Sequence, residues 1–289
     1  MNAVRLGLVA NTKSGAADRA EEVRRLLTEA GADVRLLPFD QVCDSPGDVA
    51  PTLDGIDRIV AAGGDGSLGP AARLALQAER PLAVVPIGTA NSFARWMDLP
   101  LDPAEAARIA AGTDGSTRSA EVADADGRPF VNVAATGLSV LAAHKARPFK
   151  RRLGPLAYAV GAGRAAVTGK PLHVTVRTDG AEAWKGDAWQ VLVAATGAFG
   201  GDSSTGGVDT ADHRLDVAIV PAGARIKLLQ RAFAMRRGRL VHEDEVVHVR
   251  GAEVELQVDG HPEYNVDGEV LTLDRARFSV LGTVDLVTA

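Results

Sequence analysis

The sequence predicts an α/β domain built on a parallel sheet, followed by a mainly antiparallel β domain with helical insertions. Two observations predict this fold class. Up to about residue 120, short apolar runs alternate with helical patterns, which is typical of a parallel sheet. Beyond that point, period-two runs are separated by Asp-Gly pairs at 126–127, 179–180 and 259–260, which are hairpin signals. We expect the chain to cross between the two domains at about 118–125.

In the first domain, apolar runs rich in β-branched residues predict the strands, and 3.6-residue periodicity predicts the helices between them. The predicted strands are Val4–Ala10, Val34–Leu37, Arg58–Ala62 and Leu82–Pro86. The predicted helices are Ala17–Ala30, closed by Gly31, and Leu68–Ala78.

In the second domain, alternating patterns predict strands near Leu172–Arg177, Trp189–Thr196, Leu215–Pro221, Glu253–Val258 and Arg277–Val287. Two helical insertions are expected at about Gly137–Thr168 and Ala224–Gly238. The aromatic residues of this half are expected mainly in its core, with the lining of a lipid pocket as the alternative.

Composition excludes several classes of protein. The chain has 289 residues, of which 46% are hydrophobic and 24% charged, as in an ordinary globular protein. Cys43 is the single cysteine, which excludes a disulfide framework and fits a cytoplasmic location. The net charge of −5 argues against binding nucleic acid. No apolar stretch approaches the roughly 20 residues that cross a bilayer, so we expect any membrane contact to be peripheral.

Two glycine-rich segments are the strongest functional signals. Gly63-Gly64-Asp65-Gly66-Ser67 and Gly88-Thr89-Ala90-Asn91-Ser92 each follow a predicted strand and precede a predicted helix. Glycines allow backbone N–H groups to approach an anion closely, and a helix N-terminus offers unpaired donors. Because ligands of open α/β sheets bind at the carboxyl ends of the strands, these segments predict a polyphosphate site.

Four motifs in order resemble those of one family: Asn11-x-x-Ser14-Gly15, Gly63-Gly64-Asp65-Gly66-Ser67, Gly88-Thr89-Ala90-Asn91 and Val266-Asp267-Gly268-Glu269. The chain resembles bacterial diacylglycerol-kinase-like lipid kinases, a superfamily that includes sphingosine and ceramide kinases and is more distantly similar to NAD kinases. The resemblance covers essentially the whole chain. It implies a two-domain NAD kinase-like fold with domains at 1–120 and 121–279, and a last strand at about 280–289 that returns to the first domain.

The resemblance implies that ATP is held by residues of the first three motifs. These are Asn11, Ser14, Gly15, Gly63, Gly64, Gly66, Ser67, Gly88, Thr89 and Asn91. Ser14 is equally well placed to cap the following helix, and Ser67 either caps its helix or touches phosphate.

Three carboxylates are the predicted catalytic residues. A carboxylate between glycines beside a triphosphate needs a cation, so Asp65 is expected to hold Mg²⁺ through water. Asp267 matches the aspartate that the family uses to accept the proton of the substrate hydroxyl. Glu269 would lie on the same face as Asp267 if both stood in an extended strand. The alternative is that Asp267-Gly268 is a hairpin turn like Asp259-Gly260.

The chain departs from the family pattern at two places. Ser92 stands where diacylglycerol kinases of this type commonly have aspartate. Some members also bind a structural Mg²⁺ through the aspartate that matches Asp212. Here Ala211 and His213 replace residues of that segment, which leaves Asp212 and backbone carbonyls as its evident oxygen ligands.

We therefore expect an ATP-dependent and Mg²⁺-dependent lipid kinase whose active site lies in the cleft between the domains. The acceptor is a lipid alcohol such as diacylglycerol or a sphingoid base, at a membrane surface. Basic clusters at 145–152 and 225–239 face either anionic lipid or solvent. The alternatives are an NAD kinase-like phosphotransferase and an inactive nucleotide-binding or lipid-binding protein. A homodimer is compatible with the sequence, which leaves the oligomeric state open.

Overall fold

The chain divides into two compact units. Unit 1 comprises Met1–Val122 and Leu281–Ala289, and unit 2 comprises Ala123–Val280. Strand β15 (Arg277–Thr288) therefore begins in unit 2 and ends in unit 1. The computed structural model describes residues 3–11, 17–44, 46–49, 53–113, 115–149, 156–195, 212–225, 228, 245–260, 262–273 and 275–289.

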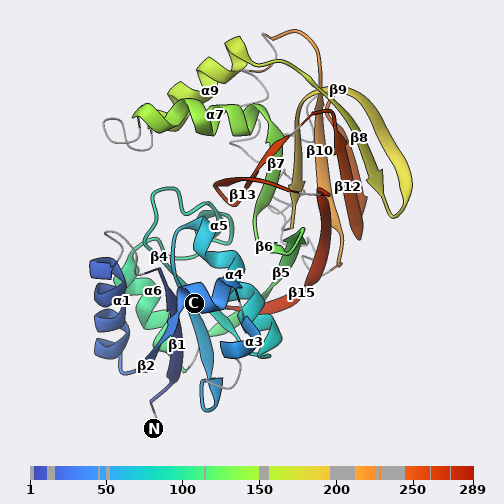
Figure 1. The fold of residues 1–289 in the computed structure, drawn as a ribbon. Helices are drawn as coiled ribbons and strands as arrows, with labels where there is room; N and C mark the ends of the chain where they lie inside the picture. The colour runs from blue at the N-terminus through green and yellow to red at the C-terminus, as the bar shows by residue number, and fades with distance from the viewer. Residues whose placement is uncertain are drawn as a thin grey trace. The chain divides into compact units, whose positions relative to one another are not determined.

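Unit 1 contains a parallel sheet, as the sequence predicted, and its strands lie in the order β2-β1-β3-β4 (Figure 1). The end of β15 joins β4 in the parallel direction through the pair Leu286 and Leu82. The four strands run within one or two residues of their predicted bounds: β1 (Arg5–Ala10), β2 (Asp33–Pro38), β3 (Arg58–Gly63) and β4 (Leu82–Pro86).

Helices cover both faces of this sheet because its strands are apolar on both sides. On one face, Leu8 and Val60 pack in a cluster with residues of α1 and α6, while Ile59 and Ala61, which alternate with them, are fully buried too. The helices are α1 (Ala17–Glu29), α2 (Phe39–Asp44), α3 (Pro46–Val49), α4 (Asp65–Gln77), α5 (Ser92–Trp96) and α6 (Pro103–Ala111).

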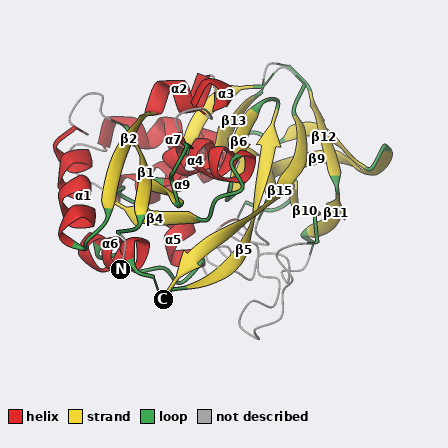
Figure 2. Cartoon of the chain, turned by 90° about the horizontal axis from the view of Figure 1, so that it is seen from below, coloured by secondary structure: helices red, strands yellow, loops and turns green. Residues whose placement is uncertain are grey.

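Unit 2 is built from antiparallel strands, which confirms the predicted second domain (Figure 2). One path through them is β14-β13-β7-β9-β8-β12-β15, and β10 pairs with β9 and β11. Strand β5 (Ser116–Ala125) begins in unit 1 and ends in unit 2. The other strands are β6 (Arg128–Phe130), β7 (Val133–Gly137), β8 (Leu172–Thr178), β9 (Ala181–Ala194), β10 (Leu215–Pro221), β11 (Val247–Gly251), β12 (Glu253–Val258), β13 (Glu263–Val266) and β14 (Glu269–Thr272).

The core of unit 2 holds aromatic residues, as expected. Phe130 meets Phe278 edge to face at 6.4 Å between ring centroids, and Tyr264 packs on the same ring of Phe278. Trp189 is 4% exposed and lies in a second cluster under the guanidinium of Arg225. These contacts give Phe130, Phe278, Tyr264 and Trp189 a structural role, while Phe199 lies outside the described residues.

The first helical insertion forms the pair α7 (Leu138–Ala146) and α9 (Leu156–Thr168), which pack side by side (Figure 1). Their close approach depends on Gly161, because a Cβ atom there would clash with the carbonyl oxygen of Ala142. The second predicted insertion lies largely outside the described residues. Among the helices that the structure describes, none combines the length and apolarity needed to span a bilayer.

Candidate functional site

The two glycine-rich loops lie against each other because the strands that precede them are neighbours. Gly63 ends β3 in register with Pro86 of β4, and the N–H of Ile87 donates to the carbonyl of Gly63 at 3.1 Å. A Cβ atom on Gly88 would clash with the Cα atom of Gly64. Glycine at both positions therefore allows two backbone loops to meet at the edge of the sheet where phosphate was expected.

Asp65 ties these two loops together. It is the first residue of α4, and its carboxylate accepts hydrogen bonds from the backbone N–H groups of Ser92 at 3.1 Å and Phe93 at 2.9 Å. Those N–H groups open α5 and have no partner within their own helix. The carboxylate predicted to hold Mg²⁺ thus also serves as the N-terminal cap of a neighbouring helix.

Asn91 closes its own loop through its side chain. Its Oδ1 atom accepts from the N–H of Gly88 at 2.9 Å, and its Nδ2 atom donates to the carbonyl of Gly88 at 3.1 Å. Its backbone has the left-handed conformation, with φ at 48°. The predicted nucleotide contact of this side chain therefore competes with two hydrogen bonds inside the loop, whereas Thr89 stands exposed at the loop tip.

The predicted start of α4 was wrong by three residues. The helix begins at Asp65, with Gly64 as its N-cap, so Ser67 lies in the first turn and does not cap it. The Ser67 hydroxyl instead points back over Gly63, since a Cβ atom built there would lie 2.5 Å from Oγ. Gly66 shares the same first turn, where backbone N–H groups are available to an anion.

The first motif is only partly visible. Asn11 directly follows β1 and is half-buried, while Ser14 and Gly15 lie outside the described residues. Helix α1 then contributes Arg19, whose Nη1 atom donates to the carbonyl of Ile87 at 3.0 Å, one residue before Gly88.

Sequence reasoning missed two arginines beside the second loop. Besides Arg19, Arg95 of α5 donates from Nε to the carbonyl of Ala90 at 3.1 Å. Both guanidinium groups are exposed and bring positive charge to a loop expected to face phosphate. Arg95 stands only three residues after the second glycine-rich segment in the sequence, but the direction of its side chain depends on the turn of α5.

Asp267 occupies a two-residue hairpin turn between β13 and β14, which are paired at Val266 and Glu269. Asp267 and Gly268 have φ values of 46° and 92°, the left-handed pattern of a type I′ turn. The alternative that Asp267-Gly268 forms a hairpin turn is therefore correct.

The Asp267 carboxylate is turned onto the chain between β6 and β7. Oδ2 accepts from the N–H of Val131 at 2.9 Å, and Oδ1 accepts from Asn132 at 3.1 Å and Val133 at 3.0 Å. The residue is 7% exposed, and these three backbone donors stabilise its negative charge.

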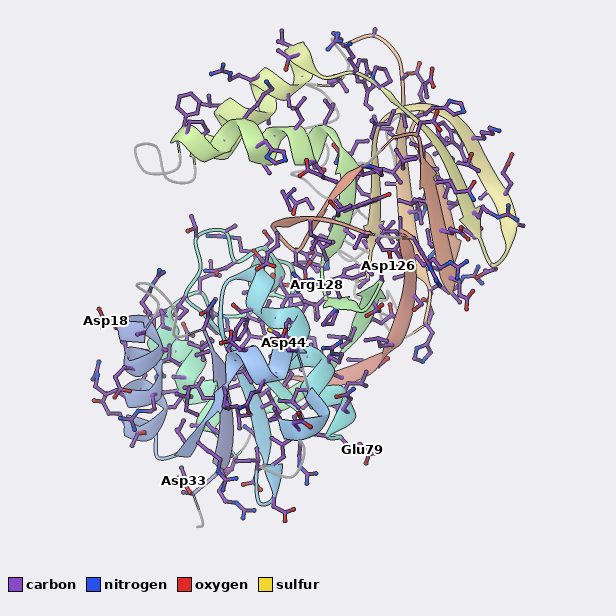
Figure 3. All side chains as sticks on the ribbon, in the orientation of Figure 1. Asp18, Asp33, Asp44, Glu79, Asp126 and Arg128 are labelled. Atoms are coloured by element: carbon purple, nitrogen blue, oxygen red, sulfur yellow. The ribbon has the colours of Figure 1, made fainter. Side chains whose placement is uncertain are left out.

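Glu269 does not share an extended face with Asp267, so that part of the sequence argument was wrong. The turn reverses the chain between them, and the exposed Glu269 carboxylate forms an ion pair with Arg128 at 3.3 Å. Arg128 and Asp126 lie on the β5–β6 hairpin (Figure 3).

Asp126 is a structural twin of Asp267. It also occupies an Asp-Gly turn, with φ at 49°, and its carboxylate accepts from the N–H groups of Arg275, Ala276 and Arg277 at 2.7 to 3.2 Å. Among the described residues of unit 2, two left-handed aspartates therefore accept hydrogen bonds from three consecutive N–H groups.

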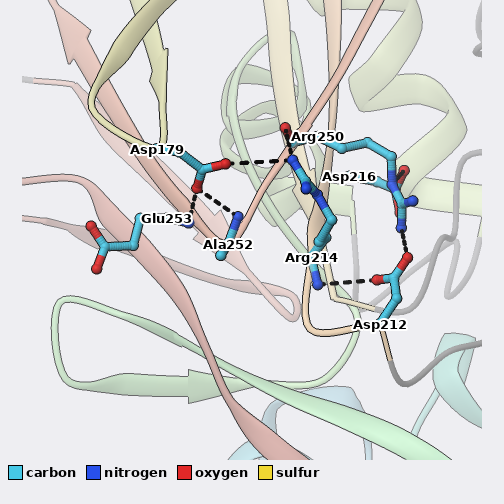
Figure 4. A network of polar contacts seen from close by, with 7 residues as sticks. All are labelled: Asp179, Asp212, Arg214, Asp216, Arg250, Ala252 and Glu253. Atoms are coloured by element: carbon cyan, nitrogen blue, oxygen red, sulfur yellow. Dashed lines mark hydrogen bonds and ion pairs between the residues drawn. The ribbon is translucent and has the colours of Figure 1, made fainter.

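The Asp212 carboxylate is bound by two arginine residues, Arg250 and Arg214 (Figure 4). Nη2 of Arg250 lies 2.6 Å from its Oδ2 atom, and the N–H of Arg214 donates to its Oδ1 atom at 3.1 Å. Partial burial acts to lower the pKa of Arg250, but the hydrogen bond to Asp212 and the charges of Asp216 and Asp212 raise it above its ordinary value. In the part of the chain that the structure describes, no three metal-ligating side chains gather at one place.

Comparison with known proteins matches both units. A model of the diacylglycerol kinase catalytic domain matches residues 5–125, and a model of the YegS C-terminal NAD kinase beta sandwich-like domain matches residues 132–285. A diacylglycerol kinase of Bacillus subtilis is 30% identical over 224 residues, which cover 74% of this chain and 71% of the relative. A probable lipid kinase YegS-like of Pseudomonas syringae is 30% identical over 239 residues, covering 76% and 72%.

The fold is also similar to that of a solved structure. A crystal structure of a diacylglycerol kinase from Bacillus anthracis superimposes with a TM-score of 0.72, at 20% identity, and covers 100% of this chain and 98% of that one. At this identity the likeness concerns the fold, and it agrees with the two-domain architecture described above.

Proposed function

Because this chain belongs to the diacylglycerol kinase family, we propose that it transfers the γ-phosphate of ATP to the hydroxyl group of a lipid alcohol. The observation that carries the proposal is the pair of glycine loops in unit 1. Gly64 and Gly88 bring two backbones into contact at the carboxyl edge of β3 and β4, where N–H groups of α4 are available to phosphate.

In this proposal the triphosphate lies over the two loops. Backbone N–H groups from Gly64 to Gly66 and the exposed loop tip at Thr89 contact its oxygens, while Arg19 and Arg95 supply positive charge. Asn11 contributes from the end of β1, together with Ser14 and Gly15 of the first motif.

Asp65 fits a magnesium ion that arrives with the nucleotide. Mg²⁺ in phosphoryl-transfer sites is commonly held by one or two carboxylates together with phosphate oxygens and water. Each oxygen of Asp65 accepts one N–H group, and a carboxylate offers about four acceptor positions, so the side chain can both cap α5 and bind metal-bound water. When bound, the ion would neutralise charge on the phosphates.

Asp267 is the proposed acceptor of the substrate proton. Glu269 begins the next strand, β14, and is paired with Arg128 of the β5–β6 hairpin. The alcohol oxygen forms a bond to the γ-phosphorus, the bond from that phosphorus to ADP breaks, and the hydroxyl proton passes to the Asp267 carboxylate. Three N–H donors hold this carboxylate in place. A fixed carboxylate suits phosphoryl transfer through a loose transition state, in which the main task of this group is to orient the hydroxyl.

The test of the reaction is transfer of labelled γ-phosphate from ATP to candidate lipids in mixed micelles. Diacylglycerol, a sphingoid base and ceramide are supplied separately, and NAD is included as a further acceptor. We expect at least one labelled lipid. Labelled NAD would favour the NAD kinase-like alternative, and nucleotide binding without any labelled product would favour an inactive binding protein.

The test of the base is Asp267→Asn with Asp126→Asn as its matched control. Asparagine tolerates the left-handed turn at both positions, and both substitutions place an amide against three N–H donors. The structural damage should therefore be similar. We expect turnover to fall at least about 100-fold in the Asp267 variant alone, with nucleotide binding retained. Equal turnover in the two variants would contradict the assignment.

We further propose that the α7–α9 pair docks on anionic lipid to obtain its substrate. Residues 131–170 contain no aspartate or glutamate, although the chain has 37 acidic residues. On α9, Val160, Arg164 and Val167 follow at spacings of four and three, so they share one face. Val160 and Val167 are 37% and 74% exposed, which places apolar side chains beside cationic ones on the surface.

Vesicle sedimentation tests this surface. The protein should bind vesicles of phosphatidylcholine mixed with phosphatidylglycerol more strongly than vesicles of phosphatidylcholine alone. Val167→Ser and Arg164→Gln should each weaken that binding. Leu36→Ser removes an exposed apolar side chain of unit 1 and serves as the control. Equal weakening in the control would exclude α9 as the docking face.

A further inference from the structure

The segment from Asp212 to Asp216, at the start of β10, is where the family resemblance implies a structural divalent metal. Such a metal requires several oxygen ligands that converge on it. Asp216 belongs to β10, and its register partner on β11 is Arg250. The side chains across this pair decide whether a metal fits.

One guanidinium bridges both aspartates. Nη2 of Arg250 lies 2.6 Å from Oδ2 of Asp212, and Nε of Arg250 lies 3.0 Å from Oδ1 of Asp216. The side chain of Asp216 is 14% exposed, so this ion pair is partly shielded from water. Such a planar fork of N–H donors matches two carboxylates better than a surface lysine would.

The remaining oxygen contacts are also made by nitrogen donors. Nε2 of His248 lies 2.6 Å from Oδ1 of Asp216, and the N–H of Arg214 donates to Oδ1 of Asp212 at 3.1 Å. A divalent ion at these oxygens would lie beside the Arg250 guanidinium and be repelled by it. The donor set therefore does not fit the implied Mg²⁺ site.

We propose that the guanidinium of Arg250 takes the place of a structural divalent cation, joining Asp212 to Asp216 so that unit 2 is stable without a metal at this position. The positive charge that a metal would supply is here part of the polypeptide. Its contribution does not depend on the concentration of free Mg²⁺.

The same network connects the start of β10 to two chain reversals, the β8–β9 turn and the passage from β11 to β12 (Figure 4). Nη2 of Arg214 lies 3.4 Å from Oδ2 of Asp179, which is in the β8–β9 turn, and also donates to the carbonyl of Arg250 at 3.2 Å. Oδ1 of Asp179 in turn accepts from the N–H groups of Ala252 and Glu253, where β11 passes into β12. Loss of Arg250 should therefore loosen more than one ion pair.

Thermal unfolding of the whole chain without nucleotide tests the proposal. The wild-type Tm should be the same in EDTA and in excess Mg²⁺. Arg250→Met should lower Tm by roughly 4 to 8 °C, because it leaves two carboxylates without their cation. The control is Arg277→Met, which removes an exposed arginine 3.9 Å from Glu255 and should change Tm by less than about 2 °C.

A double-mutant cycle gives a second measurement if Arg250→Met proves hard to purify. Arg250→Lys keeps the charge without the fork, and together with Asp212→Asn it should lower Tm by less than the sum of the single changes. Additive losses would overturn the proposal. So would a wild-type Tm that rises with Mg²⁺ when that rise is absent in Asp212→Asn, since this would identify Asp212 as a metal ligand.

Discussion

The carboxylate of Asp65 lies 3.1 Å from the backbone nitrogen of Ser92, and this hydrogen bond joins the loop after β3 to the loop after β4. A second bond, to the N–H of Phe93, makes the side chain a helix cap supplied from 27 residues earlier in the chain. The residue expected to hold the metal therefore also sets the geometry of the phosphate loops.

Asp65→Ala should impair nucleotide binding through the loops. The substitution leaves two N–H groups of α5 without their acceptor, which should cost about 1 to 2 kcal/mol of unfolding free energy. We expect the KM for ATP to rise about tenfold or more. Asp65→Asn retains one acceptor oxygen, so its KM for ATP and its Tm should lie between those of the wild type and of Asp65→Ala.

Asp54→Ala, on an exposed turn of the same unit, is the control for this change. A positioning role predicts that the ATP KM and Tm of the Asp65 variants change together. If kcat were to collapse while KM and Tm stayed at their wild-type values, Asp65 would be acting on the metal alone.

Gly88→Ala should disrupt the meeting of the two loops. Its Cβ atom would clash with the Cα atom of Gly64, which is backbone and cannot rotate away. We expect loss of measurable ATP binding in calorimetry and a lower Tm. Gly47→Ala is the matched control, because Gly47 is an exposed glycine of unit 1 with open space around its Cα atom. Wild-type affinity in the Gly88 variant would show that the loops need not touch.

Ser92→Asp should make the protein sensitive to divalent cations. It places a second carboxylate close to that of Asp65, because the backbone N–H of Ser92 already donates to Asp65. Two neighbouring carboxylates repel each other, so the Tm of the variant should fall in EDTA and recover in Mg²⁺. Ser92→Asn, which adds no charge, should show no such recovery. An identical Tm of the aspartate variant in both buffers would contradict the expected repulsion.

Acid should weaken the ion pair between Arg5 and Asp57. Hydrogen bonds from the side chain and backbone N–H of Arg5 hold the pKa of Asp57 below its ordinary value. Because the folded-state pKa is the lower one, the stabilisation is complete above the unfolded pKa of about 4 and disappears as pH falls through the folded-state value. The effect should be small, since both side chains are largely exposed.

Denaturant unfolding of wild type and Asp57→Asn as a function of pH checks this prediction. The difference in unfolding free energy should be constant near neutral pH and shrink below about pH 4. Arg5→Gln should show the same pH dependence with a smaller amplitude, because it removes the side-chain hydrogen bonds and leaves the backbone N–H donor in place. A difference that persists undiminished at about pH 2 would point to some other cause.

Much of the architecture could be predicted because it depends on local pattern. Strand β4 was predicted residue for residue, and β1 and β3 to within one residue, since their β-branched runs are bounded by glycine or charge. The Asp-Gly pair at 126–127 was recognised as a turn for the same reason, because its left-handed conformations are intrinsic to those residue types.

The errors lie where long-range contacts compete with local preference. Serine is a preferred N-cap residue, yet Ser67 does not cap α4. The helix begins at Asp65, whose carboxylate accepts hydrogen bonds from the N–H groups of Ser92 and Phe93. Likewise, the spacing of Asp267 and Glu269 fits one face of a strand until the turn between them is known.

The sequence by itself determined the two-domain fold class, the approximate bounds of the strands in the first sheet and the identity of the glycine loops, because hydrophobic period and backbone freedom are properties of neighbouring residues. Only the tertiary structure decided what each carboxylate binds. Asp65 meets α5, Asp267 meets the N–H groups of 131–133, and Asp212 meets Arg250, each from a distant part of the chain. A charged side chain pairs with whatever donor the fold brings to it, and its own sequence neighbours do not contain that information.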